Sequence, residues 1–257
     1  MCELFGFSSR DTCDISGYLK TFYTHSNMHP HGWGLACMEG TEAVIEKEPV
    51  QASKSNYLKE RLSVPVSART AFAHIRYATI GNIKYQNCHP YSKKDRQGRR
   101  WTLAHNGTIF EYSALDQYVK HQDGDTDSER ILLYLIDQIE TAEQERGHAL
   151  NAGERFALLD SIVVKMSEGN KLNLLLFDGE QVYVHTNYAN SLHYLEKDGW
   201  TMFSTLPLSR EAWKPVPFTQ LLAFRQGRLI REGTVHGNEY EDNPENIKFL
   251  YQIFADL

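Results

Sequence analysis

The feature that most constrains this chain is its N-terminus, where a cysteine directly precedes a strand-like run. Cys2 follows the initiator methionine, and the apolar run Leu4–Phe7 predicts a strand that ends at the turn Ser8–Ser9. Cysteine at position 2 is small enough for methionine aminopeptidase to expose it. The processed residue would carry both a thiol and an α-amine, which is one known way to activate a nucleophile for acyl transfer. Taken alone, however, a Met-Cys pair is more often just the residue that followed the start codon.

Length and charge limit the class of protein. The 257 residues contain no repeat and no linker, so we expect residues 2–257 to form a single domain. A net charge of −6 argues against a nucleic-acid or anionic-membrane surface. No apolar run approaches the roughly 18 residues that span a bilayer, and no basic segment followed by an apolar one opens the chain. These features predict a cytoplasmic protein.

The cysteines and histidines do not suggest a metal site. Four widely spaced cysteines form no CxxC pair, which argues against a disulfide framework and a zinc ribbon. His25, His29 and His31 cluster without the spacing that further metal ligands would need, so structural or surface roles are favoured. We expect neither a metal nor a cofactor.

Hydrophobic periodicity predicts helices followed by a strand-rich second half. Helical spacing covers 14–24, 56–62, 155–166 and a long segment after Thr126, whose spacing to Glu129 fits a capping box. Strands are expected at 35–38, 42–49, 69–75, 101–104, 173–177, 182–186, 192–196, 201–205, 220–225 and 228–231, and an amphipathic tail at 247–254.

Several polar positions allow two interpretations each. Arg76 ends a buried strand, where it needs either an internal carboxylate or a substrate carboxylate. Asn106-Gly107 is a strong hairpin signal, but the Asn106 amide and the Gly107 N–H could instead stabilise an oxyanion. Asp127 suits the positive end of a helix dipole or a substrate ammonium. The loop holding Trp33 and Gly34 is either an anchored loop or a wall of a pocket near Cys2.

These signals occur in one order along the chain, and together they resemble the class-II (N-terminal-nucleophile) glutamine amidotransferase domain, closest to its stand-alone YafJ-like branch. The motifs are Cys2, His31–Gly34, His74–Gly81, Asn87–Pro90, His105–Gly107 and Thr126–Glu129. The resemblance implies an α+β fold, a four-layer αββα sandwich of two mainly antiparallel sheets.

The resemblance also implies roles for individual residues. Cys2 would be the nucleophile, with Asn106 and Gly107 as the oxyanion hole. Arg76, helped by Thr79, would bind the substrate α-carboxylate, and Asp127 its α-ammonium. Trp33, Gly34, Tyr77 and His105 are candidate pocket-wall residues. Three positions depart from the family pattern: Ile80 stands in place of a histidine, Tyr77 in place of a tryptophan, and His31 in place of an acidic residue.

The implied activity is hydrolysis of glutamine to glutamate and ammonia through a Cys2 thioester, with an acceptor or a partner synthase to use the ammonia. A second hypothesis is hydrolysis of another γ-glutamyl amide, such as a glutathione-like or thiol conjugate, because Arg76 and Asp127 would bind any γ-glutamyl group alike. A third is a non-catalytic subunit of an amidotransferase complex. The expected partner is a small molecule rather than nucleic acid or a membrane.

Overall fold

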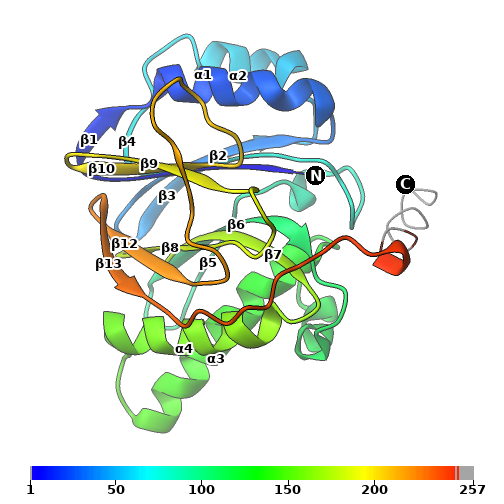
Figure 1. Cartoon of the computed structure of the whole chain (residues 1–257), viewed down its shortest axis with the longest axis vertical. Helices are drawn as coiled ribbons and strands as arrows, with labels where there is room; N and C mark the ends of the chain where they lie inside the picture. Colours follow the sequence, from blue (N-terminus) through cyan, green and yellow to red (C-terminus); the bar gives the residue numbers. More distant parts are fainter. Residues whose placement is uncertain (1, 247, 249–257) are drawn as a thin grey trace.

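The computed structural model describes residues 2–246 and 248, and it arranges them in four layers (Figure 1). Helices α1 (Ser16–Thr24) and α2 (Asn56–Arg61) cover one sheet, and α3 (Asp127–Arg146) and α4 (Ala152–Met166) cover the other. The two sheets face each other between these helical layers, and all of their strand pairings are antiparallel. The predicted αββα sandwich is confirmed.

The first sheet has seven strands in the order β11-β9-β10-β1-β4-β2-β3. Their bounds are β1 Glu3–Asp14, β2 Trp33–Glu39, β3 Glu42–Glu48, β4 Ser67–Ile75, β9 His193–Lys197, β10 Trp200–Ser204 and β11 Lys214–Pro215. The second sheet has six strands in the order β13-β12-β8-β7-β6-β5. These are β5 Tyr91–Lys94, β6 Arg100–Thr108, β7 Lys171–Phe177, β8 Val182–His185, β12 Leu222–Arg225 and β13 Arg228–Glu232. Short 3-10 turns occur at His25–Met28, Ala52–Lys54, Tyr85–Asn87 and Ser113–Lys120.

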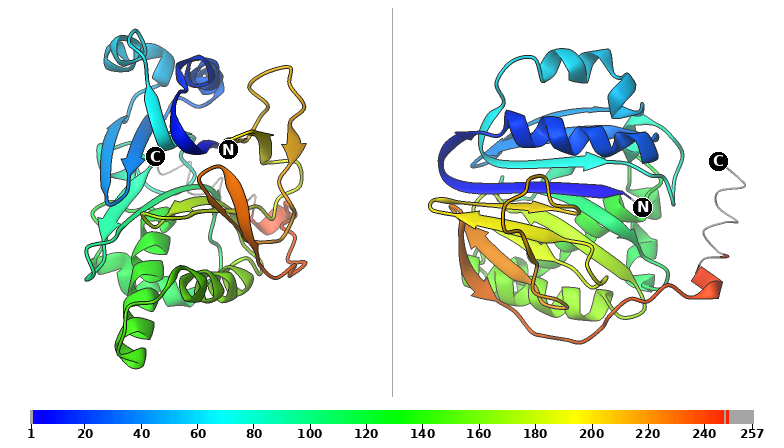
Figure 2. Two further views of the ribbon diagram at one scale, coloured as in Figure 1. Left: turned by 90° about the vertical axis from the view of Figure 1, so that its left-hand side faces the viewer. Right: turned by 45° about the horizontal axis from the view of Figure 1, so that its top comes forward.

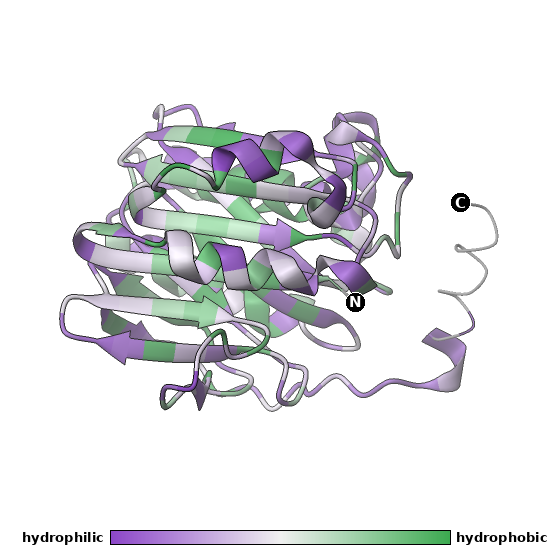
Figure 3. Ribbon diagram, turned by 90° about the horizontal axis from the view of Figure 1, so that it is seen from above, coloured by the Kyte–Doolittle hydropathy of each residue, from purple (hydrophilic) through white to green (hydrophobic). Residues whose placement is uncertain are grey.

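Three apolar clusters hold the layers together. One lies between α1, α2 and the first sheet, one between the two sheets, and one between the second sheet and α3 and α4. Figure 3 shows apolar residues concentrated along the strands, with hydrophilic residues on the outer turns and loops. Each amphipathic helix therefore buries one face against a sheet, which is the usual reason for such layering.

Strand β1 is an interior strand, paired with β4 on one side and β10 on the other. It is longer than predicted: the expected turn at Ser8–Ser9 is wrong, and the strand continues through an irregularity between Ser8 and Cys13 to Asp14. Hydrogen bonding to β4 and β10 keeps Ser8 extended, so no turn forms there. Figure 2 shows that the start of β1, which directly follows Cys2, lies at one end of the sandwich.

Most other predicted elements are present with small shifts at their ends, including the four helices and the β2–β3 and β12–β13 hairpins. The hairpin turn considered at Asn106-Gly107 is wrong, because both residues lie within β6 and pair with Asn173 and Leu172. Half of the predicted capping box forms: Thr126 Oγ1 accepts from the Glu129 N–H at 3.2 Å, while the Glu129 carboxylate instead accepts from the backbone of 123 and 124. The predicted tail at 247–254 lies outside the described residues, apart from Lys248.

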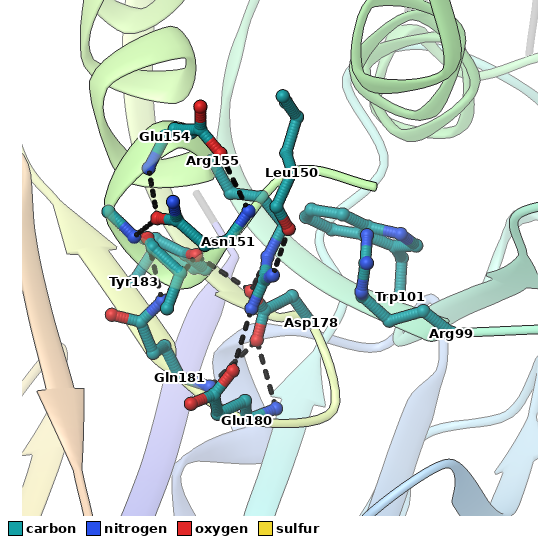
Figure 4. Close-up of polar contacts among 12 residues, drawn as sticks. Arg99, Trp101, Leu150, Asn151, Glu154, Arg155, Asp178, Glu180, Gln181 and Tyr183 are labelled. Atoms are coloured by element: carbon teal, nitrogen blue, oxygen red, sulfur yellow. Dashed lines mark hydrogen bonds and ion pairs between the residues drawn. The ribbon is translucent and has the colours of Figure 1, made fainter. Parts of the chain in front are cut away.

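A buried ion pair ties α4 to the turn after β7 (Figure 4). Arg155 Nε donates to the Asp178 carboxylate at 2.7 Å, and its other nitrogens donate to the Leu150 carbonyl at 2.8 Å and to Glu180 at 2.9 Å. Tyr183 Oη donates to the same Asp178 oxygen at 2.7 Å. This network aligns the helix with the sheet beneath it. Among residues 2–246 and 248, no helix is long and apolar enough to cross a membrane.

Candidate active site

The Cys2 thiol lies against the backbone of Tyr77, just beyond the last β1–β4 pair, Glu3 with Ile75. The Tyr77 N–H donates to Cys2 Sγ at 3.3 Å, and the thiol can donate to the Tyr77 carbonyl at the same distance. Burial raises the pKa of the Cys2 thiol, and the backbone of Tyr77 opposes that shift. The arrangement fixes the sulfur and provides a donor for a thiolate.

Strand β6 carries Asn106 and Gly107 past the thiol. Asn106 is buried, and in the part of the chain that the structure describes its side-chain amide makes no hydrogen bond. Gly107 lies against β7 so closely that a β-carbon there would be 1.9 Å from the Lys171 carbonyl oxygen and 2.5 Å from His105 Nε2. Only glycine fits this position without moving the two strands.

Cys2, Thr79, Asn106 and Gly107 line one pocket of ≈ 60 Å³. This is small beside the roughly 300–1,000 Å³ of drug-sized ligand sites. A larger hollow of ≈ 550 Å³ lies beside Lys47 and Tyr85, but none of the predicted site residues lines it. The small pocket is therefore the candidate active site, because the predicted nucleophile Cys2 and the two predicted oxyanion donors, Asn106 and Gly107, all line it.

Arg76 is buried after β4 and binds the loop that follows it. Its guanidinium donates to the carbonyl oxygens of Ile80, Gly81 and Asn82 at 3.0, 2.8 and 2.9 Å. No carboxylate of the described residues lies within 4.0 Å of it, so the internal salt bridge considered from the sequence does not form. These bonds use three of the five guanidinium N–H groups, and the other two make no hydrogen bond to the described residues. Arg76 is not among the residues that line the small pocket.

Asp125 fixes the same loop from the other side. Its carboxylate accepts from the Asn82 N–H at 3.2 Å, from the Asn87 amide, and from Lys84 Nζ at 2.9 Å. Gly81 takes φ +81°, a conformation that favours glycine. The segment after Arg76 is thus held between a buried cation and a surface carboxylate.

Asp127 is the first residue of α3 and is buried with both carboxylate oxygens hydrogen-bonded. One oxygen accepts from the Ile109 N–H at 2.8 Å, and the other from the Ser128 N–H at 2.8 Å and the Ser128 hydroxyl at 3.3 Å. These donors fix the Asp127 side chain beside the end of β6, because Ile109 follows Gly107 by only two residues. The helix N-terminus supplies further favourable potential for a carboxylate.

The four candidate wall residues have different positions. Trp33 is fully buried in the cluster beneath α1 and α2, and its indole N–H donates to Glu48 at 3.1 Å, so it does not line the pocket. Gly34 allows a close approach of the His89 carbonyl, which would lie 1.9 Å from a β-carbon. Tyr77 reaches Cys2 through its backbone, and the buried His105 lies 2.9 Å from Ser128 Oγ. Neither Gly34 nor His105 is among the residues that line the pocket.

A comparison with protein-family models matches residues 1–202 to "Glutamine amidotransferases class-II". This match covers most of the chain. The chain belongs to the class-II glutamine amidotransferases, which are enzymes. The predicted glutamine amidotransferase YafJ of Escherichia coli is 30% identical over 200 residues, covering 77% of this chain and 76% of YafJ.

Two solved structures share the fold of this amidotransferase. A predicted glutamine amidotransferase from Pseudomonas aeruginosa superposes with a TM-score of 0.61 at 19% identity, covering 90% of this chain and all of that one. Glutamine phosphoribosylpyrophosphate amidotransferase from B. subtilis superposes with a TM-score of 0.63 at 16% identity, covering 91% of this chain and 49% of that one. At these identities the likeness concerns the fold.

The structure adds pocket residues of the amidotransferase that the sequence did not indicate. These are Thr108, Phe110, Lys171, Tyr240 and Asp242. Lys171 precedes the predicted strand 173–177 and looks like an ordinary strand-flanking lysine. Only the pairing of Lys171 with Thr108 across β6 and β7 reveals its position, and no local sequence signal predicts that register.

Proposed function

We propose that this amidotransferase hydrolyses the side-chain amide of glutamine to glutamate and ammonia through a thioester on Cys2. The observation that carries the proposal is that Cys2, Asn106 and Gly107 line one pocket. A nucleophile beside two potential oxyanion donors is the arrangement that acyl transfer requires. The proposal includes removal of Met1, so that the α-amine belongs to Cys2.

In the proposed reaction, Cys2 Sγ attacks the δ-carbon of glutamine while the α-amine accepts the thiol proton. The Asn106 amide and the Gly107 N–H stabilise the oxyanion. The amine then returns its proton to the leaving nitrogen, the C–N bond breaks, and ammonia departs. Water hydrolyses the thioester to release glutamate and restore the thiol.

The amino-acid end of glutamine would lie between Arg76 and Asp127. Arg76 keeps two N–H donors for an α-carboxylate, with the Thr79 hydroxyl beside the pocket. Asp127 provides a fixed carboxylate for the α-ammonium. A fixed cation and a fixed anion complement a zwitterion and orient its amide toward the thiol.

We also infer that residues 2–257 act as one amidotransferase domain. The pairing of β1 with β10 and of β6 with β7 joins early and late parts of the chain in both sheets, which supports this inference. The ammonia could pass to a partner synthase. A thiol nucleophile must stay reduced, which favours a cytoplasmic location.

The test compares the unmodified chain with Cys2→Ala, using glutamate release from glutamine as the readout. Intact mass should first establish that Met1 is absent. Cys2→Ala should lose turnover and keep its circular dichroism spectrum, while Cys13→Ala, a half-buried free cysteine away from the pocket, should stay active. Full activity of Cys2→Ala would rule the proposal out.

A further inference from the structure

The Ser128 hydroxyl beside Asp127 has one proton and two acceptors within reach. Its oxygen lies 3.3 Å from Asp127 Oδ1 and 2.9 Å from His105 Nδ1. The other two donors to Asp127, the N–H groups of Ile109 and Ser128, belong to the backbone and cannot turn away. A hydroxyl can rotate. The direction of this one proton therefore decides whether Asp127 carries two donors or three.

The ring of His105 determines that direction. His105 Nε2 lies 3.3 Å from the Lys171 carbonyl oxygen, which can only accept a hydrogen bond. In the neutral ring Nε2 therefore carries the proton, and Nδ1 is an acceptor. Burial lowers the pKa of His105, so the neutral ring predominates at neutral pH. Nδ1 then takes the Ser128 proton, since its contact with the hydroxyl is the shorter of the two.

His105 lies behind the strand that carries the proposed oxyanion hole. Along β6, Leu103 packs in the cluster beneath α3 and α4, and Ala104 packs in the cluster between the two sheets. Side chains alternate along a strand, so His105 faces the helices and Asn106 faces the other sheet. This explains why His105 does not line the pocket. From this position His105 can affect a bound substrate only through another residue.

Asp127 is the residue through which it can act. The charges of Asp127 and Arg76 both reach the Cys2 thiol: Arg76 lowers the pKa of the thiol and Asp127 raises it. A carboxylate has about four lone-pair positions, and the two backbone N–H groups occupy two of them. A third donor from Ser128 would compete with an incoming ammonium for the remaining positions.

We propose that His105 is a positioning residue that holds the Ser128 hydroxyl proton away from Asp127 and so keeps this carboxylate available to the substrate α-ammonium. The inference rests on the proposed role of Asp127 in binding glutamine. His105 then contributes to the choice of substrates with a free α-amino group, and not to the transfer of the acyl group to Cys2.

The experiment compares kcat/KM for glutamine with that for glutaramate, which is glutamine without its α-amino group. His105→Gln carries an amide toward the place of Nε2 and leaves no acceptor at Nδ1, whereas His105→Asn can keep an oxygen near Nδ1. His105→Gln should lower the glutamine-to-glutaramate ratio about two- to tenfold, the effect of one ordinary hydrogen bond, mainly through KM for glutamine. His105→Asn should retain most of the ratio. A merely structural role would impair both substrates alike.

Two further variants complete the design. His121→Gln, at an exposed histidine, is the matched control and should keep the ratio of the unmodified chain. The double variant His105→Gln/Ser128→Ala should return to the ratio of Ser128→Ala, because no hydroxyl is left to turn toward Asp127. If the double variant stays as low as His105→Gln, or if His105→Gln keeps the ratio of the unmodified chain, the inference is wrong.

Asp127→Asn separates this inference from the proposed function. It should lower the ratio more than any other variant, and an unchanged ratio would refute the role of Asp127 itself. A lowered ratio in Asp127→Asn beside an unchanged one in His105→Gln would overturn only the role of His105. Should His105→Gln not fold, ¹⁵N NMR of the histidine rings in the unmodified chain decides. The proton of His105 should lie on Nε2, and a proton on Nδ1 would overturn the inference.

Discussion

The backbones of Gly107 and Lys171 approach closely between β6 and β7, and a β-carbon at residue 107 would lie 1.9 Å from the Lys171 carbonyl oxygen. The same contact sets the spacing of β6 and β7 beside the pocket, which both residues line. The geometry of the pocket therefore depends on the absence of one methyl group.

We expect Gly107→Ala to be both unstable and inactive. The added carbon must push β6 from β7, and overpacking of this kind typically costs about 1–3 kcal/mol. Urea denaturation and glutamate release would measure the two effects. Gly17→Ala is the matched control, because nothing lies within 4 Å of its β-carbon position in α1, so its stability should be equal or slightly higher. A stable, active Gly107→Ala would contradict the close approach.

Asn106→Ala should reduce turnover while leaving the fold intact. Removing one oxyanion donor typically lowers kcat about 100- to 1,000-fold. Because the Asn106 side chain makes no hydrogen bond within residues 2–246 and 248, its removal breaks no structural contact there. Steady-state kinetics with glutamine, beside the exposed control Asn56→Ala, would check this, and a normal kcat would exclude Asn106 from the oxyanion hole.

Arg155→Met should destabilise the fold strongly. It leaves the fully buried Asp178 carboxylate without its cation, and breaking one partner of such a pair costs about 3–5 kcal/mol. Arg146→Met removes the exposed pair with Glu154 and should cost less than about 1 kcal/mol. Chemical denaturation of both variants measures the difference. Equal decreases in the free energy of unfolding would show that burial does not determine how much the Arg155–Asp178 pair contributes to stability.

Stability should fall in acid through buried histidines. Burial lowers the pKa of His74 and of His185 from 6.5 to about 3, so between these values the unfolded chain binds the extra protons and the folded chain does not. The free energy of unfolding should therefore decrease as pH falls below 6.5, by up to about 1.4 kcal/mol per pH unit for each histidine.

Denaturation curves between about pH 6.5 and pH 4 would measure this slope. His74→Phe should reduce the slope by the share of His74 and leave that of His185, because a phenyl ring takes up no proton in the unfolded chain. His148→Gln, at an exposed histidine, should keep the slope of the unmodified chain. A His74→Phe slope equal to that of the unmodified chain would show that His74 does not contribute to the pH dependence of stability.

Local periodicity predicted the helices and hairpins because each buries one regular face. It failed at Asn106-Gly107, where the dipeptide is typical of a turn but pairing with β7 keeps it extended. Arg76 was expected to meet either an internal or a substrate carboxylate. The structure rules out the internal one, because three loop carbonyls accept from the guanidinium, and this arrangement depends on the fold of residues 80–82. Lys171 lies 65 residues beyond Asn106 in the chain, so only the register of β6 and β7 could bring it to the pocket.

Residues Phe5–Ser8 of β1 are paired on both sides, which holds the segment just after Cys2 inside the sheet. Its amide protons should exchange with solvent about as slowly as those of the deepest strands, through opening of the whole sheet. Catalytic competence and cooperative folding would then disappear together in denaturant, without a separate earlier loss at the terminus.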